Sequence, residues 1–524
     1  MQAGSREFVL HDGASAGPDV LHAVLGAVSD SIAWANGGPV SLCRRTWLDT
    51  FDWRLYRAGL TLEQVTAHGH VELTLTGRDG DVLASERLQG GAISWPSLLT
   101  ALPPGPLREL LEPVAGVRAL SPVARAASRV AALRALNGDA KTVAKLAVDQ
   151  MSVTFPARAI APVRLTLEPL RGYQGQAERA ARLLAGLPGV SAGRGSALDT
   201  ALSAAGYRPG ERPGKAVGIA LSPDRPASTA MAAILTSLLD SLEANVPGTV
   251  RDIDTEFLHD LRIAVRWTRS ALKLSANALP DGLAASFRPE FGWLGSLTTP
   301  TRDLDVYLLG FSGMAAGLVG ATEIELAPFR DHLLKSRAVA YRQLARGLRS
   351  ARFRRLTADW RAALAGVRAV RKRPTIGQLA DARIAAADRK ALRAGELITA
   401  SSPAESLHDL RKRCKELRYV VEMFGSLHDP AQRWQAVREL KALQDCLGEF
   451  QDAEVQRAEI RAFAAQMLAE RSAPAETLLA MGEIAAGLAV RQHEARARFD
   501  GRFADFASPA SQARLAALAR TSAA

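Results

Sequence analysis

Cysteine is scarce in this sequence and is not arranged to form a site. The 524 residues include Cys43, Cys414 and Cys446, which lie far apart along the chain. Because no C-x-x-C pair occurs, the pattern favours neither a zinc cluster nor a disulfide framework. Isolated thiols of this kind are typical of a reducing compartment.

Long apolar runs are also missing. No uninterrupted stretch reaches the roughly 20 apolar residues that a membrane-spanning helix needs. The N-terminus carries Arg6, Glu7, His11 and Asp12 where a secretion signal would need an apolar core. The sequence therefore predicts a cytoplasmic protein without a membrane partner.

Aromatic residues make up only 6% of the chain, whereas positive charge is abundant. The formal net charge is +12, and Arg and Lys exceed Asp and Glu by about nine from residue 225 onward but by about three before it. A localised basic excess favours a polyanionic partner, namely nucleic acid, anionic lipid or a phosphate polymer. The few aromatics argue against stacking on single-stranded nucleic acid, although the charge keeps a nucleic-acid binder as an alternative.

The two halves of the chain differ in pattern. Within residues 1–210, the segments HVELTLTG and DVLASERLQ flank an Asp79-Gly80 turn, which predicts antiparallel strands in an α+β domain. Residues 211–226 are rich in Pro and Gly and predict a linker. Over 227–510 the apolar residues recur with a helical period, which predicts an all-α domain, and 511–524 is predicted to be a tail.

The helical half contains an internal repeat. LHDLRIAVRWTRSALKL (258–274) falls on LHDLRKRCKELRYVVEMF (407–424) after a shift of 149 positions, and RDLDV (302–306) then falls on QDAEV (451–455). One register over several blocks indicates a duplicated helical unit. The sequence therefore predicts two repeats, over about 227–370 and 376–510, packed with pseudo-twofold symmetry.

Each repeat carries a basic helix face, because its cations recur at alternating steps of three and four. A face of like charges destabilises itself, so we expect a polyanion to bind between the two faces in a groove or pore. The candidate residues of the two rows are His259, Arg262, Arg266, Arg269, Lys273, His408, Arg411, Lys415 and Arg418. The repeat register adds Arg342, Arg349, Arg491 and Arg498.

Other polar residues of the repeat have a structural interpretation. The two histidines are either capped structural groups or donors to phosphate. The acids Asp303, Asp305, Asp452 and Glu454 are interpreted as salt-bridge partners that orient arginines. The two rows differ at one end, where Lys273 falls on Glu422.

These motifs resemble those of the CHAD family, the conserved histidine α-helical domain, over roughly residues 225–510. The resemblance implies two pseudo-symmetric four-helix bundles with basic residues lining a central pore. It also implies binding of inorganic polyphosphate and association with polyphosphate granules in bacteria. The motifs suggest no metal and no cofactor, and they do not specify an oligomeric state.

The stretch RRTWLDTFDWRLYRAGLTLEQ (44–64) resembles CYTH domains, which often share a chain with CHAD domains. That resemblance implies an antiparallel β-tunnel, and CYTH enzymes bind triphosphate and metal with an N-terminal E-x-E-x-K strand. The positions that depart from the CYTH pattern here are Ala3, Ser5, Glu7, Glu63, Gln64 and Thr76. The sequence therefore predicts a CYTH-like scaffold without catalytic residues and a non-enzymatic protein, with a metal-dependent triphosphate or polyphosphate hydrolase as the alternative.

Overall fold

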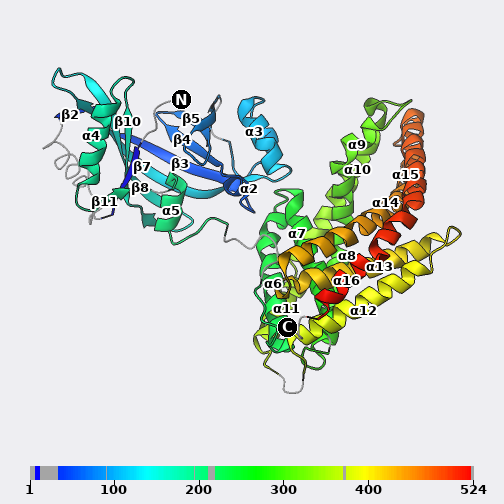
Figure 1. Cartoon of the computed structure of the whole chain (residues 1–524). Coiled ribbons are helices and arrows are strands. Elements are labelled where there is room, and N and C mark those ends of the chain that lie inside the picture. The colour runs from blue at the N-terminus through cyan, green and yellow to red at the C-terminus, as the bar shows by residue number, and fades with distance from the viewer. Residues whose placement is uncertain are drawn as a thin grey trace. The chain divides into compact units, whose positions relative to one another are not determined.

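The chain divides into two compact units, Met1–Pro213 and Gly214–Ala524, each described here by itself (Figure 1). The structure is a computed structural model, and it describes residues 6–11, 33–89, 91, 93–193, 195–210, 219–275, 277–369 and 373–520. The division falls within the predicted linker, of which residues 211–218 lie outside the described ranges. The described remainder of that segment belongs to the helical unit, because Leu221 is buried in its core.

The N-terminal unit is built on one antiparallel sheet. The described strands are β1 (Arg6–Leu10), β2 (Ala33–Asn36), β3 (Ser41–Thr50), β4 (Thr61–Ala67), β5 (His70–Thr76), β6 (Val82–Leu88), β7 (Leu120–Leu136), β8 (Thr142–Phe155), β9 (Ala159–Ile160), β10 (Val163–Pro169) and β11 (Val190–Ala192). Their hydrogen bonds follow the order β11-β1-β10-β8-β7-β3-β4-β5-β6, with β2 paired to β7 and β9 to β8.

Short helices cover this sheet. They are α2 (Arg54–Arg57), η1 (Leu99–Ala101), α3 (Pro106–Ala115), α4 (Gln174–Ala185) and α5 (Ala197–Ala204). Alternation places Val71, Leu73 and Leu75 of β5 on the buried face of the sheet, where they pack with residues of α3. Strands β5 and β6 pair as the predicted hairpin, so the expected antiparallel α+β unit is confirmed.

The C-terminal unit is helical throughout its described secondary structure. The first repeat contains α6 (Ala227–Val250), α7 (Thr255–Leu274), α8 (Leu283–Leu309), α9 (Phe311–Ala316), α10 (Glu323–Leu348) and α11 (Ala351–Ala365). The second contains α12 (Ile376–Glu396), α13 (Ala404–Met423), η2 (Gly425–Leu427), α14 (Pro430–Ala469), α15 (Ala475–Ala507) and α16 (Pro509–Leu518). In Figure 1 the first repeat is green and the second runs from yellow to red.

The helix boundaries follow the sequence repeat. Both ends of α7 fall on the ends of α13 after a shift of 149 residues, and α6, α8 and α10 fall on α12, α14 and α15. Across the two repeats, α6 contacts α12, α7 contacts α13 and α10 contacts α15. Contacts between an element and its own counterpart are what a twofold axis produces. The predicted pair of related helical bundles is therefore present.

The core of the helical unit is divided. The larger apolar cluster joins α6, α7, α11, α12 and α13 and includes the fully buried Trp360. A second cluster joins α8, α9 and α10 with α14 and α15 around Phe329. The predicted tail over 511–524 instead begins with α16, whose Leu515 and Leu518 are buried in the larger cluster. The apolar residues of that short helix therefore extend the core of the helical unit into the predicted tail.

Candidate functional site: a row of cations across the two repeats

Helix α7 carries its basic residues opposite a buried apolar face. The Asp254 side chain caps the helix by accepting hydrogen bonds from the backbone N–H groups of Glu256 and Phe257. Leu261 and Leu272 lie on the buried face. On the other face Arg262 is half-buried, whereas Arg266, Arg269 and Lys273 are exposed. The helix is therefore fixed by its apolar side and presents its cations outward.

Helix α13 repeats this arrangement with less exposure. Leu410, Cys414 and Leu417 are buried, and burial raises the pKa of the Cys414 thiol to about 12. The opposite face carries Arg411, Lys415 and Arg418, all of them half-buried. The basic side chains of α13 are therefore partly withdrawn from water, which makes their mutual repulsion more costly.

The two basic faces meet where α7 and α13 cross. Lys273, at the end of α7, pairs with Glu416 in the middle of α13 at 2.8 Å. Arg266, earlier on α7, lies 5.4 Å from the ring centroid of Tyr419, later on α13. A later residue of α7 thus lies beside an earlier residue of α13, and the reverse, so the two helices cross in antiparallel directions. Tyr419 also packs against Trp267, with 5.5 Å between ring centroids.

Six cations form a continuous row through this crossing, and we call them the cation row. Arg262 is close enough to Arg266 and to Arg302 of α8 that both charges lower its pKa, after the larger effect of burial. The row therefore starts on α8 and runs along α7. Its members are Arg302, Arg262, Arg266, Lys415, Arg411 and Arg418.

Lys415 joins the two halves of the row. Burial is the main cause that lowers the pKa of its ammonium group, and the charges of Arg411, Arg266 and Arg418 lower it further, to about 8. Arg266 belongs to the first repeat and the other two arginines to the second. The like charges therefore approach one another across the interface between the repeats.

Several donors of the row are unused. Arg302 Nη1, Arg411 Nε and Arg418 Nε are buried and have no hydrogen-bond partner among the described residues. Buried polar groups in proteins are normally hydrogen-bonded, and exceptions call for an explanation. Guanidinium N–H groups suit the oxygens of phosphate particularly well. The row therefore combines an excess of positive charge with buried guanidinium donors that lack a hydrogen-bond partner.

Acids accompany the row without neutralising it. Asp452 pairs with Arg411 at 2.9 Å, and the charge of Arg262 opposes the burial that raises the pKa of Asp303. The positions of Arg262 and Asp303 correspond to those of Arg411 and Asp452 under the repeat. Asp305 is buried and pairs with Arg337 at 2.5 Å. The interpretation of the acids as salt-bridge partners is confirmed for Asp452 and Asp305, while Glu454 is half-buried on α14.

The histidines lie one turn before the arginines. His408 Nδ1 is hydrogen-bonded to Gln451 Oε1 of α14, so this ring is held between two helices. His259 is half-buried at the equivalent place on α7. His408 therefore has the structural role that the sequence allowed. Donation to phosphate by either histidine stays a prediction.

The residues added by the repeat register lie on the outer helices. Arg342 donates to Ala338 O of its own helix, and Arg349 donates to Val250 O at 3.3 Å. Arg498 pairs with Glu449 of α14, and Arg491 is exposed on α15. Their described contacts are with α6, α10 and α14 rather than with the cation row. Arg302 belongs to the RDLDV motif, but the helical spacing of the cations did not identify it as a member of the cation row.

In the N-terminal unit, two largely buried arginines are paired with carboxylates. Arg45 of β3 pairs with Glu63 of β4 and with Asp149 of β8. Arg164 of β10 pairs with Glu7 of β1. Each of these guanidinium groups therefore already has a carboxylate partner.

The remaining positions that depart from the CYTH pattern are also occupied by internal contacts. The Gln64 side chain accepts a hydrogen bond from Trp95 Nε1 at 2.8 Å, and Thr76 Oγ1 donates to Thr61 O. Ala3 and Ser5 lie outside the described residues. Within the described ranges, no group of three or more His, Cys, Asp or Glu side chains is placed to hold a metal ion.

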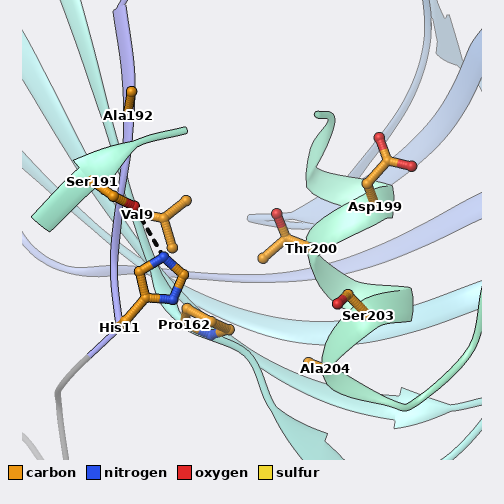
Figure 2. A pocket seen from close by; sticks show the side chains of 9 residues that line it. All are labelled: Val9, His11, Pro162, Ser191, Ala192, Asp199, Thr200, Ser203 and Ala204. Atoms are coloured by element: carbon orange, nitrogen blue, oxygen red, sulfur yellow. Dashed lines mark hydrogen bonds between the residues drawn. The ribbon is translucent and has the colours of Figure 1, made fainter. Parts of the chain in front are cut away.

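A cavity of about 700 Å³ lies between β1, β11 and helix α5. Figure 2 shows His11 hydrogen-bonded to Ser191 on one side, and Asp199, Thr200 and Ser203 on the other. Both Asp199 oxygens are engaged, since one accepts from Ser196 and the other from the hydroxyl of Tyr56. The described lining contains neither Arg nor Lys.

Three solved structures are similar to parts of this chain. The CHAD domain from the plant Ricinus communis is 23% identical over 55% of this chain and 95% of its own, with a TM-score of 0.47. PptA from Streptomyces chartreusis is 18% identical over 52% of this chain and 97% of its own, with a TM-score of 0.40. A putative adenylate cyclase from Bacillus halodurans is 13% identical over 35% of this chain and 89% of its own, at 0.25.

Two further findings complete the comparison. No curated protein matches the chain, and none of the described helices is long and apolar enough to cross a membrane. The family model of the CHAD domain matches residues 233–461, a span that begins in α6, ends in α14 and includes the whole cation row. Residues 233–461 of the helical unit therefore match the CHAD domain family.

Proposed function

We propose that the CHAD domain of this chain binds inorganic polyphosphate along the cation row and does so without catalysis. The observation that carries the proposal is the approach of Arg266 to Lys415 and Arg418 across the repeat interface. Like charges at such a place destabilise the fold unless an anion lies between them. A linear polyanion compensates all six cations at once and releases counterions on binding.

The surroundings of the row favour polyphosphate over nucleic acid. Tyr419 and Trp267, the aromatic residues of the crossing, are 7% and 9% exposed. The guanidinium groups of Arg266 and Arg418 both lie over the Tyr419 ring. The ring faces are thus unavailable for base stacking, which single-stranded nucleic acids require for tight binding. What the row offers a ligand is charge and N–H donors.

The N-terminal unit supports a non-enzymatic protein. Metal-assisted phosphoryl chemistry needs clustered carboxylates around a metal ion. Glu7, Glu63 and Asp149 are instead paired with arginines. In this proposal the unit is a CYTH-like scaffold that supports the protein structurally or recruits a partner. We place the protein in the cytoplasm at polyphosphate granules, where its ligand is concentrated.

Charge reversal tests the proposal. The variant with Arg262, Arg266, Arg411 and Lys415 all changed to Glu should bind labelled polyphosphate at least 100-fold more weakly in a gel-retention assay. Wild-type affinity should fall steeply with salt, with a slope of log affinity against log salt near −4 for six contacts on a flexible chain.

A matched control separates the row from total charge. Arg389, Lys390, Arg393 and Arg461 are exposed on α12 and α14, and their change to Glu alters the net charge equally. This control should retain polyphosphate binding to within a few-fold. Equal loss in both variants, or displacement of polyphosphate by DNA at equal phosphate concentration, would overturn the proposal. Phosphate release from polyphosphate by the purified chain with Mg²⁺ would favour the hydrolase instead.

A further inference from the structure

Glu422 occupies the crossing at the place where the repeats differ. It lies one helical turn after Arg418, with 3.7 Å between its carboxylate and Arg418 Nε. Its counterpart in the first repeat is Lys273, since the ends of α7 and α13 correspond. The second repeat therefore places a negative charge where strict symmetry would place a positive one.

The neighbours of Glu422 are members of the cation row. Arg418 and Arg266 both lie over the ring of Tyr419, at 5.7 and 5.4 Å from its centroid. Burial raises the pKa of Glu422, while Arg418, Arg266 and Arg433 lower it. One carboxylate thus faces guanidinium groups from both repeats at the middle of the row.

We propose that Glu422 is an internal counter-ion of the cation row and competes with the polyphosphate that binds there. This inference rests on the proposed function and adds a residue that sets affinity. Without ligand, the carboxylate screens Arg266 and Arg418 from one another and holds the crossing together. When a phosphate approaches the same guanidinium groups, it meets the charge of Glu422, so the complex is weaker than the number of cations would allow.

Two measurements test the inference with the full chain and the variant Glu422→Gln. The control is Glu290→Gln, which removes a carboxylate of the same unit paired with Arg352 at 2.9 Å. That pair lies on α8 and α11, away from the row. Both variants change the net charge by one and replace the acid by an amide of the same shape.

The first measurement is the thermal midpoint without polyphosphate. At low salt, Glu422→Gln should lower the midpoint by about 2–4 °C relative to Glu290→Gln, because the row loses its counter-ion. Sodium sulfate should abolish this difference in midpoint, because it supplies an anion in place of the lost carboxylate. If the two variants melt together at low salt, Glu422 is not a counter-ion, whatever the protein binds.

The second measurement is polyphosphate affinity. Glu422→Gln should bind about three- to tenfold more tightly than wild type, with a steeper salt dependence, while Glu290→Gln stays within twofold. A purely structural role of Glu422 predicts weaker binding. Unchanged or weaker binding therefore overturns the inference. Failure of wild type and both variants to bind overturns the proposed function, while the midpoint comparison still decides the role of Glu422.

Discussion

Two groups of arginines in this chain have opposite charge environments. In the N-terminal unit, Arg45 lies between the carboxylates of Glu63 and Asp149, and Arg164 pairs with Glu7. In the helical unit, Arg266 and Arg411 have Lys415 as a common neighbour, and the three charges repel. The first group contains its own counter-ions, whereas the cation row has more cations than acids beside it.

This comparison teaches how to separate a structural arginine from a binding one. Arginines of both kinds lie on regular elements, and Arg411 is partly buried like Arg45, so burial and secondary structure do not distinguish them. The charges of the neighbours do, because a balanced cluster gains little from an anion and an unbalanced one gains much.

The largest expected effect concerns Arg45, whose charge is balanced by Glu63 and Asp149. Arg45→Met should destabilise the N-terminal unit by about 3–5 kcal/mol, because it leaves Glu63 and Asp149 close together without their cation. Urea unfolding followed by tryptophan fluorescence would measure this, since Arg45 lies 5.1 Å from the ring of Trp47. Polyphosphate affinity should not change. A loss below 1 kcal/mol would contradict the view that this arginine is structural.

In the cation row, loss of one charge should change the free energy of unfolding with the opposite sign. Lys415→Met removes one of several like charges, so it should stabilise the helical unit by about 1 kcal/mol at low salt. The same change should weaken polyphosphate binding about tenfold, since a charged donor to phosphate is lost. Thermal unfolding and a binding titration on the same samples check both effects. Destabilisation by Lys415→Met would contradict the difference in charge balance between the Arg45 group and the cation row.

The stability difference should also depend on pH. The pKa of Lys415 is about 8 in the fold, below its ordinary value of 10.5. The cost of its charge is therefore complete below pH 8 and disappears as the pH rises from 8 to 10.5, because the folded state loses the proton first. Stability of wild type relative to Lys415→Met should rise over that interval. Lys415→Arg, which stays charged, should show no such rise.

Ligand binding should reverse this shift in the pKa. An anion beside Lys415 favours the ammonium form, so we expect the complex to take up roughly half a proton at pH 8. Calorimetric titrations in two buffers of different ionisation enthalpy measure the uptake. The variant Lys415→Arg should bind without it. Equal uptake by that variant would assign the proton to another group.

The smallest effect concerns the orientation of Arg262. Its Nη1 donates to Thr299 Oγ1 at 2.7 Å, which directs the guanidinium group along the row. Thr299→Val should weaken polyphosphate binding about threefold, since one neutral hydrogen bond is lost. The thermal midpoint should stay within 1 °C. Wild-type affinity in this variant would show that Arg262 needs no support from α8.

Much of the helical unit was predictable because its signal is local and repeated. The shift of 149 positions found in the sequence reproduces both ends of α7 and α13. The apolar face of α7, with Leu261 and Leu272, required no more than the helical period. The antiparallel hairpin of β5 and β6 was equally visible, since alternation and a Gly-containing turn specify it.

The membership of the site was less predictable. Arg349 and Arg498 fall on one register of the repeat, yet they contact Val250 O and Glu449 rather than the cation row. Arg302 belongs to the row although it lies on another helix. A helical period says which residues share a face of one helix, but it contains no information on which faces of different helices meet.

The sequence by itself determined the repeat, the helices and the direction in which each one presents its cations, because these depend on neighbours within a few turns. Only the tertiary structure decided that α7 and α13 cross near Tyr419, so that Arg266 meets Lys415 and Glu422. Helix crossing is set by the packing of side chains distant in sequence. The balance of charge at that crossing is therefore a property of the fold.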